Sequence, residues 1–291
     1  EITYGDWSSD VCSSDLSLGV RKLRLTGGEP LLRAGLPDLV AELASIEGVT
    51  DLALTTNGVL LAQHASELAA HGLKRVTVSL DTLDPETFRQ LSGGFDGLPR
   101  VLDGIRAAQE AGLAPVKVNA VIQRGVNDHQ APALAEHFRG TGVIVRFIEY
   151  MDVGNRNDWR PKLVVPSREV RDTIAAQYPL APLPGTYHGE VAERYAYQDG
   201  SGEIGFISSV SQPFCGDCTR ARISAEGRLY TCLFASEGSD LKRHLRPTLD
   251  TAALRETLRA RWTAREDRYS ELRDAETAHR VPKVEMFRVG G

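Results

Sequence analysis

Three of the four cysteines in this 291-residue chain are clustered in one short segment, as Cys215, Cys218 and Cys232. The spacing C-x2-C-x13-C is typical of a metal or iron–sulfur site, but a soft metal bound only by protein normally takes four ligands. A structural zinc ion could use the three thiolates with His244 as its fourth ligand. Alternatively, the thiolates could hold an iron–sulfur cluster in which one iron stays open to an external ligand. The spacing alone leaves both possibilities open.

Two arginines, Arg220 and Arg222, directly follow the first cysteine pair. In an extended segment, residues two apart lie on the same face, so both guanidinium groups would lie beside the open position of a cluster. The planar guanidinium fork matches phosphate and carboxylate groups, and each charge-assisted hydrogen bond contributes roughly 1.5–3 kcal/mol. The segment is therefore a candidate for holding an anionic ligand next to a metal, with a solvated surface strand as the alternative.

A second candidate site is the sequence GGEP, which begins with Gly27, Gly28 and Glu29. It follows an apolar run directly and precedes a helical pattern. Two glycines let a ligand approach the backbone closely, and exposed N–H groups together with the carboxylate could hold a zwitterion by its two charged ends. Alone, a Gly-Gly turn after a strand is a weak signal. It gains weight from the polar strand ends TTNG at residues 55–58 and SLD at residues 79–81.

The elements that would position these groups are short apolar runs that alternate with amphipathic stretches. The strand-like runs cover residues 23–26, 51–56, 75–81, 116–122 and 143–150. The intervals between them suit single helices, with apolar residues at helical spacing. A strand followed by a helix, repeated in this way, predicts a parallel α/β sheet or barrel.

The expected strands have one apolar and one polar face. The polar positions are Lys22, Arg24 and Thr26, then Thr77, Ser79 and Asp81, then Lys117 and Asn119. The interior of an ordinary barrel is filled with apolar side chains, because buried unpaired charges are costly, and parallel sheets are normally covered on both faces. We therefore predict an open, ligand-filled barrel rather than an exposed sheet. Its site is expected at the carboxyl ends of the strands, near Thr26, Thr55, Ser79, Asn119 and Glu149.

Composition narrows the class of protein. With 42% hydrophobic and 25% charged residues, the chain is long enough for one large or two modest domains with a buried core. No apolar run approaches the roughly 20 residues of a membrane-spanning helix, so we expect no membrane segment and no signal peptide. A net charge of −5 argues against a general nucleic-acid binder. The clustered cysteines favour a reducing cytoplasm over a secreted disulfide framework.

Three regions differ in their sequence pattern. Residues 1–16 have no helix or strand period, contain the near repeat SSDV and SSDL, and resemble translated sequencing-adapter read-through, so we assign no function to Cys12. Residues 17–165 carry the alternation of strands and helices. Residues 166–291 lack this alternation, contain the cysteine segment, and are expected to form a smaller region packed on the barrel.

Several segments, taken in order, resemble the GTP 3′,8-cyclases of molybdenum cofactor biosynthesis, a family of radical S-adenosylmethionine enzymes. They are KLRLTGGEPLLR, LALTTNGVLL, VTVSLDTLDPETF, VKVNAVIQRGVND, VRFIEYMDVG, SVSQPFCGDCTRARIS and the terminal GG. GGEP alone indicates only the superfamily, whereas the cysteine triad with TRAR and the Gly-Gly end indicate this family. The resemblance extends from about residue 17 to residue 291.

The resemblance implies a fold and a chemistry. The fold is a partial (βα)6 TIM-like barrel, here without its first strand, closed by a C-terminal region that carries a 4Fe-4S cluster. An N-terminal 4Fe-4S cluster, held by a CxxxCxxC motif, cleaves S-adenosylmethionine to a 5′-deoxyadenosyl radical. The radical takes hydrogen from C3′ of GTP, and the sugar radical attacks C8 to give (8S)-3′,8-cyclo-7,8-dihydroguanosine 5′-triphosphate. The C-terminal cluster binds guanine through its open iron.

The resemblance also implies roles for individual residues, without assigning a catalytic side chain. Positions that match S-adenosylmethionine contacts are Gly27, Gly28, Glu29, Ser79 and Met151. Positions that match GTP contacts are Arg24, Thr55, Lys117 and Arg220, with Arg222, Lys22, Asn119 and Arg146 as further contributors. The ligands of the second cluster are Cys215, Cys218 and Cys232, and the tail Gly290–Gly291 enters the active site.

One departure from the family pattern affects the expected activity. The CxxxCxxC motif should precede Ser17, where this sequence has only Cys12, so we expect the chain as written to be inactive. As partners we expect GTP, S-adenosylmethionine, an electron donor, a downstream cyclic pyranopterin monophosphate synthase and a second copy in a homodimer, but no nucleic acid and no membrane. The alternatives are a zinc-stapled, non-catalytic nucleotide-binding protein and a peptide-modifying radical S-adenosylmethionine enzyme.

Overall fold

The computed structural model describes residues 18–155, 157–273 and 283–290. Our predictions for residues 1–16, including Cys12, and for Gly291 lie outside these residues. Within the described ranges, no helix is both long enough and apolar enough to cross a membrane.

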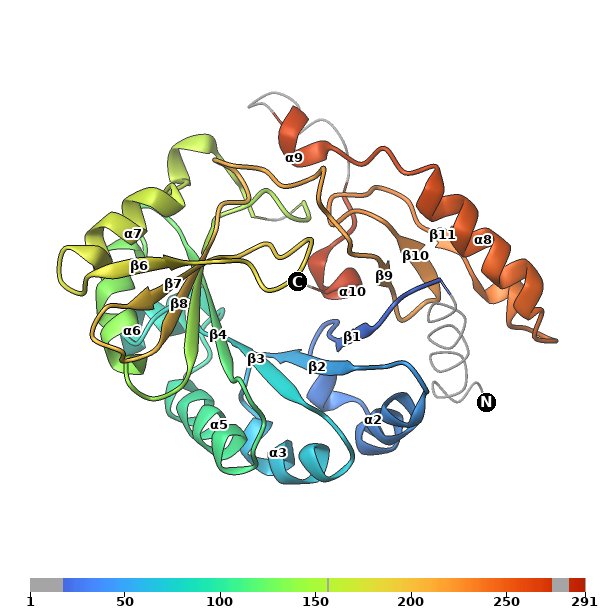
Figure 1. Ribbon diagram of the computed structural model, residues 1–291, viewed down its shortest axis with the longest axis horizontal. Coiled ribbons are helices and arrows are strands. Elements are labelled where there is room, and N and C mark those ends of the chain that lie inside the picture. Colours follow the sequence, from blue (N-terminus) through green and yellow to red (C-terminus); the bar gives the residue numbers. More distant parts are fainter. Residues whose placement is uncertain (1–17, 156, 274–282, 291) are drawn as a thin grey trace.

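A curved sheet forms the centre of the molecule (Figure 1). Its first five strands are parallel and lie in chain order: β1 (Lys22–Leu25), β2 (Asp51–Thr56), β3 (Arg75–Ser79), β4 (Lys117–Ile122) and β5 (Ile144–Glu149). β8 (Glu203–Ile207) lies parallel beside β5, and the antiparallel strands β7 (Glu193–Tyr197) and β6 (Leu180–Leu183) follow it. β1 and β6 are the two edges, so the sheet curves around the interior as a partial barrel.

The sequence-based fold class is confirmed, and each of the five predicted strands is present within two residues of its expected ends. One feature of the sheet differs from the strand–helix alternation in the sequence. β6, β7 and β8 lie after residue 165, where the alternation ends, and they still join the same sheet. Their place in this sheet is not predicted by the sequence, because β6 and β7 are antiparallel and lack the intervening helices that identified the first five strands. The division into residues 17–165 and 166–291 stays a prediction.

Helices cover the convex side of the sheet (Figure 1). They are α2 (Leu36–Ser45), α3 (Leu61–Ala70), α4 (Pro85–Leu91), α5 (Leu98–Glu110), α6 (Ala131–Phe138) and α7 (Ser167–Ala175), with short 3-10 turns η1 (Pro30–Leu32), η2 (Asp128–Gln130) and η3 (Pro161–Leu163). Apolar residues at helical spacing, such as Val40 and Leu43 on α2, are buried against the strands. α5 packs closely on the loop after β2 because Gly104 has no side chain, and a Cβ there would lie 2.5 Å from the carbonyl oxygen of Gly58.

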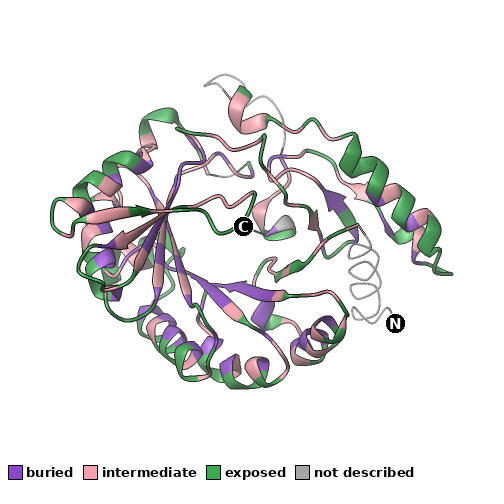
Figure 2. Ribbon diagram, viewed as in Figure 1, coloured by how far each residue is buried: buried purple, intermediate pink, exposed green. Residues whose placement is uncertain are grey.

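The C-terminal region has a small core of its own. The strands β9 (Arg222–Ile223), β10 (Arg228–Tyr230) and β11 (Ser239–Asp240) form an antiparallel sheet, followed by η4 (Lys242–His244), α8 (Thr251–Thr263), α9 (Tyr269–Leu272) and α10 (Met286–Val289). Leu229, Leu241, Leu254 and Leu258 pack together there. Figure 2 shows that most buried residues lie along the barrel strands, whereas the outer faces of α3, α5 and α8 are exposed.

Candidate active site

The barrel interior brings polar side chains from several strands together. Nη1 of Arg24 on β1 donates to Oγ1 of Thr55 on β2 at 2.8 Å and to Oγ1 of Thr77 on β3 at 3.2 Å. Nε of Arg146 on β5 donates to Oδ1 of Asn119 on β4 at 2.9 Å. The apolar residues that alternate with them pack against the helices. The polar face of the sheet therefore points into the barrel, as its alternation predicts.

The interior carries more positive charge than the acidic groups beside it neutralise. Asp51 is hydrogen-bonded to Arg75 at 2.8 Å, and Glu203 pairs with Arg194 at 2.6 Å. Among the residues that the structure describes, no ion pair within 4.0 Å engages the four remaining cations. These are Lys22, Arg24, Lys117 and Arg146.

The local environment acts on the ionisation of these cations. Burial, reinforced by Arg24 and Arg75, lowers the pKa of Arg146 to about 10. Burial, reinforced by Arg146 and Arg75, lowers the pKa of Lys117 to about 8. Lys22 and Arg24 nevertheless keep part of their surface accessible to solvent, so the interior is open. An anionic ligand that entered this space would relieve the mutual repulsion of the cations.

The GGEP turn lies at the carboxyl end of β1, where its Glu29 is fully engaged. One carboxylate oxygen accepts from the N–H of Leu31 at 3.0 Å and from Oγ1 of Thr56 at 2.7 Å, and the other accepts from the N–H of Asn57 at 2.8 Å. Glu29 thus ties the turn to the end of β2. Gly27 has φ of 135°, a conformation that favours glycine.

The other positions matched to S-adenosylmethionine lie at neighbouring strand ends. Ser79 ends β3 and is exposed, Gly28 is exposed in the GGEP turn, and Met151 follows β5 and is half-buried. Contact of these residues with S-adenosylmethionine stays a prediction, as does that of Gly27 and Glu29.

Two acidic groups at these strand ends support the backbone. Glu149 is buried and accepts from the N–H groups of Ser167, Val210 and Ser211, each at 2.7 Å, and from the Ser211 hydroxyl at 2.5 Å. Oδ1 of Asp81 accepts from the N–H of Val121 at 2.8 Å. Glu149 binds the start of α7 and the segment after β8, and Asp81 binds β4. The sequence pattern does not distinguish these roles from ligand binding.

The cysteine segment has reduced, partly buried thiols beside arginines. Cys215, Cys218 and Cys232 are all free. Nη2 of Arg220 lies 3.4 Å from Sγ of Cys218, and Arg265, which sequence reasoning missed, donates to the Cys218 carbonyl. Burial alone would raise the pKa of the Cys218 thiol, but the charge and hydrogen bonds of Arg220 lower it below its ordinary value. Burial, with the charge of Arg220, lowers the pKa of Arg222 to about 10.

The arrangement bears on the choice between zinc and an iron–sulfur cluster. Ligands of one zinc ion lie within about 4 Å of each other, because each zinc–sulfur bond is ~2.3 Å long. No group of three or more Cys, His, Asp or Glu side chains in the described ranges is placed to hold one metal ion. Nε2 of His244 lies 3.0 Å from Oγ1 of Thr257. In the described residues, His244 is therefore not grouped with the three cysteines.

A cluster places different requirements on the same side chains. Its thiolates bind separate iron atoms at separate corners, so they need not converge on one point. Three reduced thiols and two arginines fit such a group. Among the residues that the structure describes, the buried Nε of Arg220 also has no hydrogen-bond partner, so it is available to a group bound beside the thiols.

The C-terminal tail returns to the barrel. The N–H of Lys283 donates to Oδ1 of Asn155 at 2.9 Å, and the side-chain amide of Asn155 donates to the Lys283 carbonyl at 2.6 Å. Farther along, Gly290 is buried so closely against the Thr26 side chain that a Cβ at this position would clash. Gly290 therefore lies at the end of β1, next to the GGEP turn.

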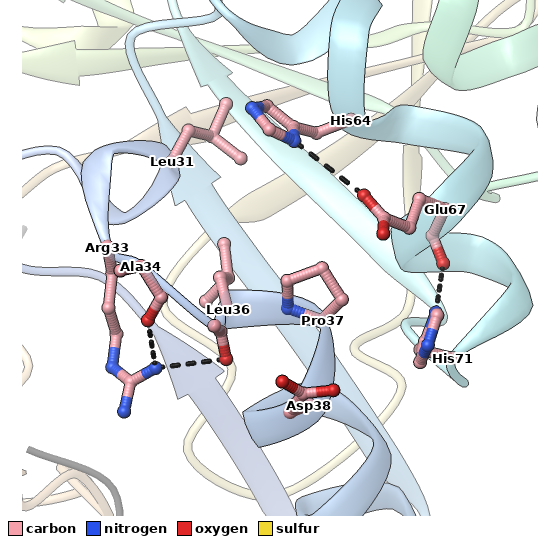
Figure 3. Close-up of a pocket in the computed structure, with 10 residues that line it drawn as sticks. Leu31, Arg33, Ala34, Leu36, Pro37, Asp38, His64, Glu67 and His71 are labelled. Atoms are coloured by element: carbon pink, nitrogen blue, oxygen red, sulfur yellow. Dashed lines mark hydrogen bonds and ion pairs between the residues drawn. The ribbon is translucent and has the colours of Figure 1, made fainter. Parts of the chain in front are cut away.

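One surface pocket of about 380 Å³ lies away from these residues (Figure 3). It is formed between η1, α2 and α3, and it contains His64, Glu67 and His71. His64 lies 4.0 Å from Glu67, and Nδ1 of His71 lies 2.7 Å from the Glu67 carbonyl oxygen. The pocket contains none of the predicted site residues, so it is separate from the candidate active site.

Two protein-family models match the chain. The Radical SAM superfamily model matches residues 14–138, and the Molybdenum Cofactor Synthesis C model matches residues 143–271. Together they cover both the strand–helix region with GGEP and the region with the cysteine segment.

Curated relatives named GTP 3′,8-cyclase are similar over most of the chain. One from Xanthomonas campestris pv. campestris is 58% identical over 276 residues, which cover 95% of this chain and 80% of the relative. One from Acidothermus cellulolyticus is 52% identical over 305 residues, with coverage of 97% and 84%. Among solved structures, coproporphyrinogen III oxidase from Escherichia coli, described as a radical SAM enzyme, has a TM-score of 0.41 and 12% identity and covers 69% of this chain and 55% of its own.

Proposed function

Because the chain belongs to the GTP 3′,8-cyclase family of radical S-adenosylmethionine enzymes, we propose that it acts on GTP in the first step of molybdenum cofactor biosynthesis. The product would be (8S)-3′,8-cyclo-7,8-dihydroguanosine 5′-triphosphate. The observation that carries this proposal is the cationic set of the open barrel, defined as Lys22, Arg24, Lys117 and Arg146.

The cationic set would bind the triphosphate. A triphosphate brings several negative charges and many acceptor oxygens. It would supply the negatively charged partners that the set lacks among the described residues. Thr55 and Asn119 already hold the guanidinium groups of Arg24 and Arg146 in place. Their contribution would therefore be to orient these cations before the nucleotide binds.

The cysteine segment would hold the base of the nucleotide. Cys215, Cys218 and Cys232 would bind the second 4Fe-4S cluster, which would present one open iron to the guanine. Arg220 would donate from its free Nε toward this ligand, and Arg222 would add positive charge beside it. The nucleotide would then span from the cluster to the cationic set.

The ligands of the radical-generating cluster, unlike those of the second cluster, are not found in these 291 residues. The 291 residues contain no CxxxCxxC motif, so they do not supply its thiolates. We expect a polypeptide of these 291 residues to form no 5′-deoxyadenosine from S-adenosylmethionine after anaerobic reconstitution, and robust formation would contradict this.

Metal analysis tests the role of the cysteine segment. After anaerobic reconstitution, we expect iron and acid-labile sulfide to bind, and the variants Cys215→Ser, Cys218→Ser and Cys232→Ser each to lose most of both. Addition of GTP should change the electron paramagnetic resonance spectrum of the reduced cluster, because a ligand at the open iron alters its environment. Stoichiometric zinc without sulfide would contradict the proposal and favour the zinc-stapled alternative.

GTP binding tests the role of the barrel. Equilibrium dialysis with GTP and guanosine should show tighter binding of GTP, and Arg146→Met should remove most of this difference. Failure of the unaltered chain to bind GTP would overturn the proposed function. The electron donor, the downstream synthase and a homodimer remain predictions.

A further inference from the structure

The loop between β6 and β7, residues 184–192, extends toward the middle of the molecule (Figure 1). At its tip the ring of Tyr187 lies against Lys22 on β1, with the lysine Nζ 3.3 Å from the ring centroid. This is a close cation–π contact. Tyr187 is 49% exposed, so it does not belong to the hydrophobic core.

The same loop faces the rest of the cationic set. Tyr187 lies near enough to Arg24 and Arg146 that its oxygen, when ionised, raises the pKa of each guanidinium that burial lowers. Glu190 acts in the same direction on Arg146 and Lys117. The Glu190 carboxylate is held within the loop, where it accepts from the N–H of Thr186 at 2.7 Å.

The loop also contacts the cysteine segment. Gly189 has φ of 80°, and a Cβ there would lie 2.7 Å from Oγ1 of Thr219 and 2.9 Å from the carbonyl oxygen of Asp217. Only glycine allows this close approach without displacement of one of the two segments. Asp217 and Thr219 flank Cys218, so the loop lies between the cationic set and the proposed cluster site.

We propose that Tyr187 is a positioning residue for the phosphates of the nucleotide. Its ring holds the Lys22 ammonium toward the barrel interior, and Gly189 fixes the loop against the cysteine segment. The loop thereby sets the spacing between the group that binds the phosphates and the group that binds the base. This inference rests on the proposed function, since it assumes that a nucleoside triphosphate occupies the barrel.

The face of an aromatic ring suits this task better than a carboxylate would. A carboxylate beside Lys22 would neutralise the ammonium and compete with the phosphates for it. A ring attracts the cation through its quadrupole but leaves the full positive charge available. The position therefore requires an aromatic ring, and the phenolic hydroxyl is dispensable.

The experiment is equilibrium dialysis of the full chain with GTP and with guanosine, which lacks the phosphates. Tyr187→Leu should weaken GTP binding about 3- to 10-fold, the effect of one cation–π contact, and leave guanosine binding within about twofold. Tyr187→Phe should keep the affinity of the unaltered chain for both. If Tyr187→Leu binds GTP as tightly as the unaltered chain, or weakens GTP and guanosine equally, the proposal is wrong.

A double-mutant cycle tests whether Tyr187 acts through Lys22. Once Lys22→Met has removed the ammonium, the further change Tyr187→Leu should have no additional effect on GTP binding. Additive effects would overturn the proposal. A matched control is Tyr178→Leu, which removes a tyrosine whose ring centroid lies 4.8 Å from Cζ of Arg139, outside the barrel. It should leave the affinities for GTP and guanosine unchanged.

The outcomes separate this inference from the proposed function. If the unaltered chain does not bind GTP, the proposed function fails. If it binds GTP but the cycle is additive, only the role of Tyr187 fails. Thermal unfolding of each variant shows whether an altered affinity reflects loss of the fold, and Tyr187→Gln provides a second variant that lacks the ring.

Discussion

The ammonium of Lys283 lies 2.6 Å from Oδ2 of Asp152 and 2.8 Å from the Asp152 carbonyl oxygen, with both side chains almost fully buried. Arg273 pairs with the other carboxylate oxygen at 2.8 Å, and the Tyr269 hydroxyl also donates to Asp152. Asp152 directly follows Met151, and Lys283 begins the last described segment. A buried carboxylate thus joins the loop after β5 to the tail that reaches Thr26.

Replacement of Asp152 should destabilise the protein more than replacement of Lys283. Asp152→Asn removes the buried carboxylate charge that pairs with both Lys283 and Arg273, and we expect it to cost about 3–5 kcal/mol. Lys283→Met leaves the pair of Asp152 and Arg273 intact and should cost less. Urea denaturation of each variant measures the free energy of unfolding.

Two further variants make this comparison sharper. Lys162→Met removes an exposed lysine and should change the free energy of unfolding by less than about 0.5 kcal/mol. The double variant Asp152→Asn with Lys283→Met should cost less than the sum of the single changes, because the two side chains interact directly. A larger cost for Lys283→Met than for Asp152→Asn would contradict the assigned role of the carboxylate.

The affinity for GTP should fall as pH rises through about 8. Burial, with Arg146 and Arg75, lowers the pKa of Lys117 to about 8, and bound phosphates would raise it because they favour the charged form. Below this pH the ammonium is charged in the free protein, so affinity is constant. Above it, each binding event must take up a proton, so affinity falls by up to about tenfold per pH unit. Equilibrium dialysis between about pH 7 and 9 measures this slope.

Two substitutions at Lys117 identify the source of the slope. Lys117→Arg keeps its charge throughout this range and should retain affinity at high pH, and any slope that it shows belongs to the nucleotide or to other groups. Lys117→Met should bind GTP more weakly at neutral pH, with the same residual slope as Lys117→Arg. Equal slopes in all three proteins would rule out Lys117 as the titrating group.

Glu149 should be essential for stability although it lies at the mouth of a candidate active site. Glu149→Gln keeps one acceptor oxygen but turns an amide toward backbone N–H groups of Ser167, Val210 and Ser211, so buried donors lose their partners. We expect a loss of about 3–5 kcal/mol in the free energy of unfolding. The exposed Glu47→Gln is the matched control and should be neutral. A stable Glu149→Gln with altered ligand binding would instead favour a direct contact with ligand.

The barrel strands could be predicted because polar and apolar residues alternate along them, which gives each strand one polar and one apolar face. Lys117 and Asn119 alternate with Val118 and Ala120. In a parallel sheet whose apolar face is covered by helices, the polar residues must then face a polar barrel interior. β6 and β7 could not be predicted in the same sheet, because antiparallel strands without intervening helices carry no crossover signal. Their placement depends on contacts with β8 that are distant from the first five strands in chain order.

The candidate site could be predicted where residue type and strand position coincide, as for Arg24 and Arg146. It could not be predicted where a side chain arrives from a loop of another region. Tyr187 and Arg265 have no local pattern, and their roles come from the contacts with Lys22 and Cys218 that the fold creates. At Glu29, the contact with S-adenosylmethionine stays a prediction, and the structure adds that its oxygens accept from the N–H groups of Leu31 and Asn57.

Asp81→Asn should stabilise the protein at neutral pH and lose this effect in acid. Burial raises the pKa of Asp81 from 3.8 to about 6, although the Val121 N–H opposes the shift. The protonated form is therefore favoured in the folded state, and its contribution to stability, complete below pH 3.8, is lost as pH rises through about 6. Asparagine stays neutral and keeps an oxygen for the Val121 N–H. At pH 8 we therefore expect a gain of about 1–2 kcal/mol in the free energy of unfolding, which is reduced because Asp81 is partly exposed.

Urea denaturation at pH 5 and 8 measures this gain. Asp81→Ala, which lacks the acceptor oxygen, should be destabilised at both pH values. A loss of stability in Asp81→Asn that is equal at the two pH values would show that the carboxylate is stabilised in its ionised form.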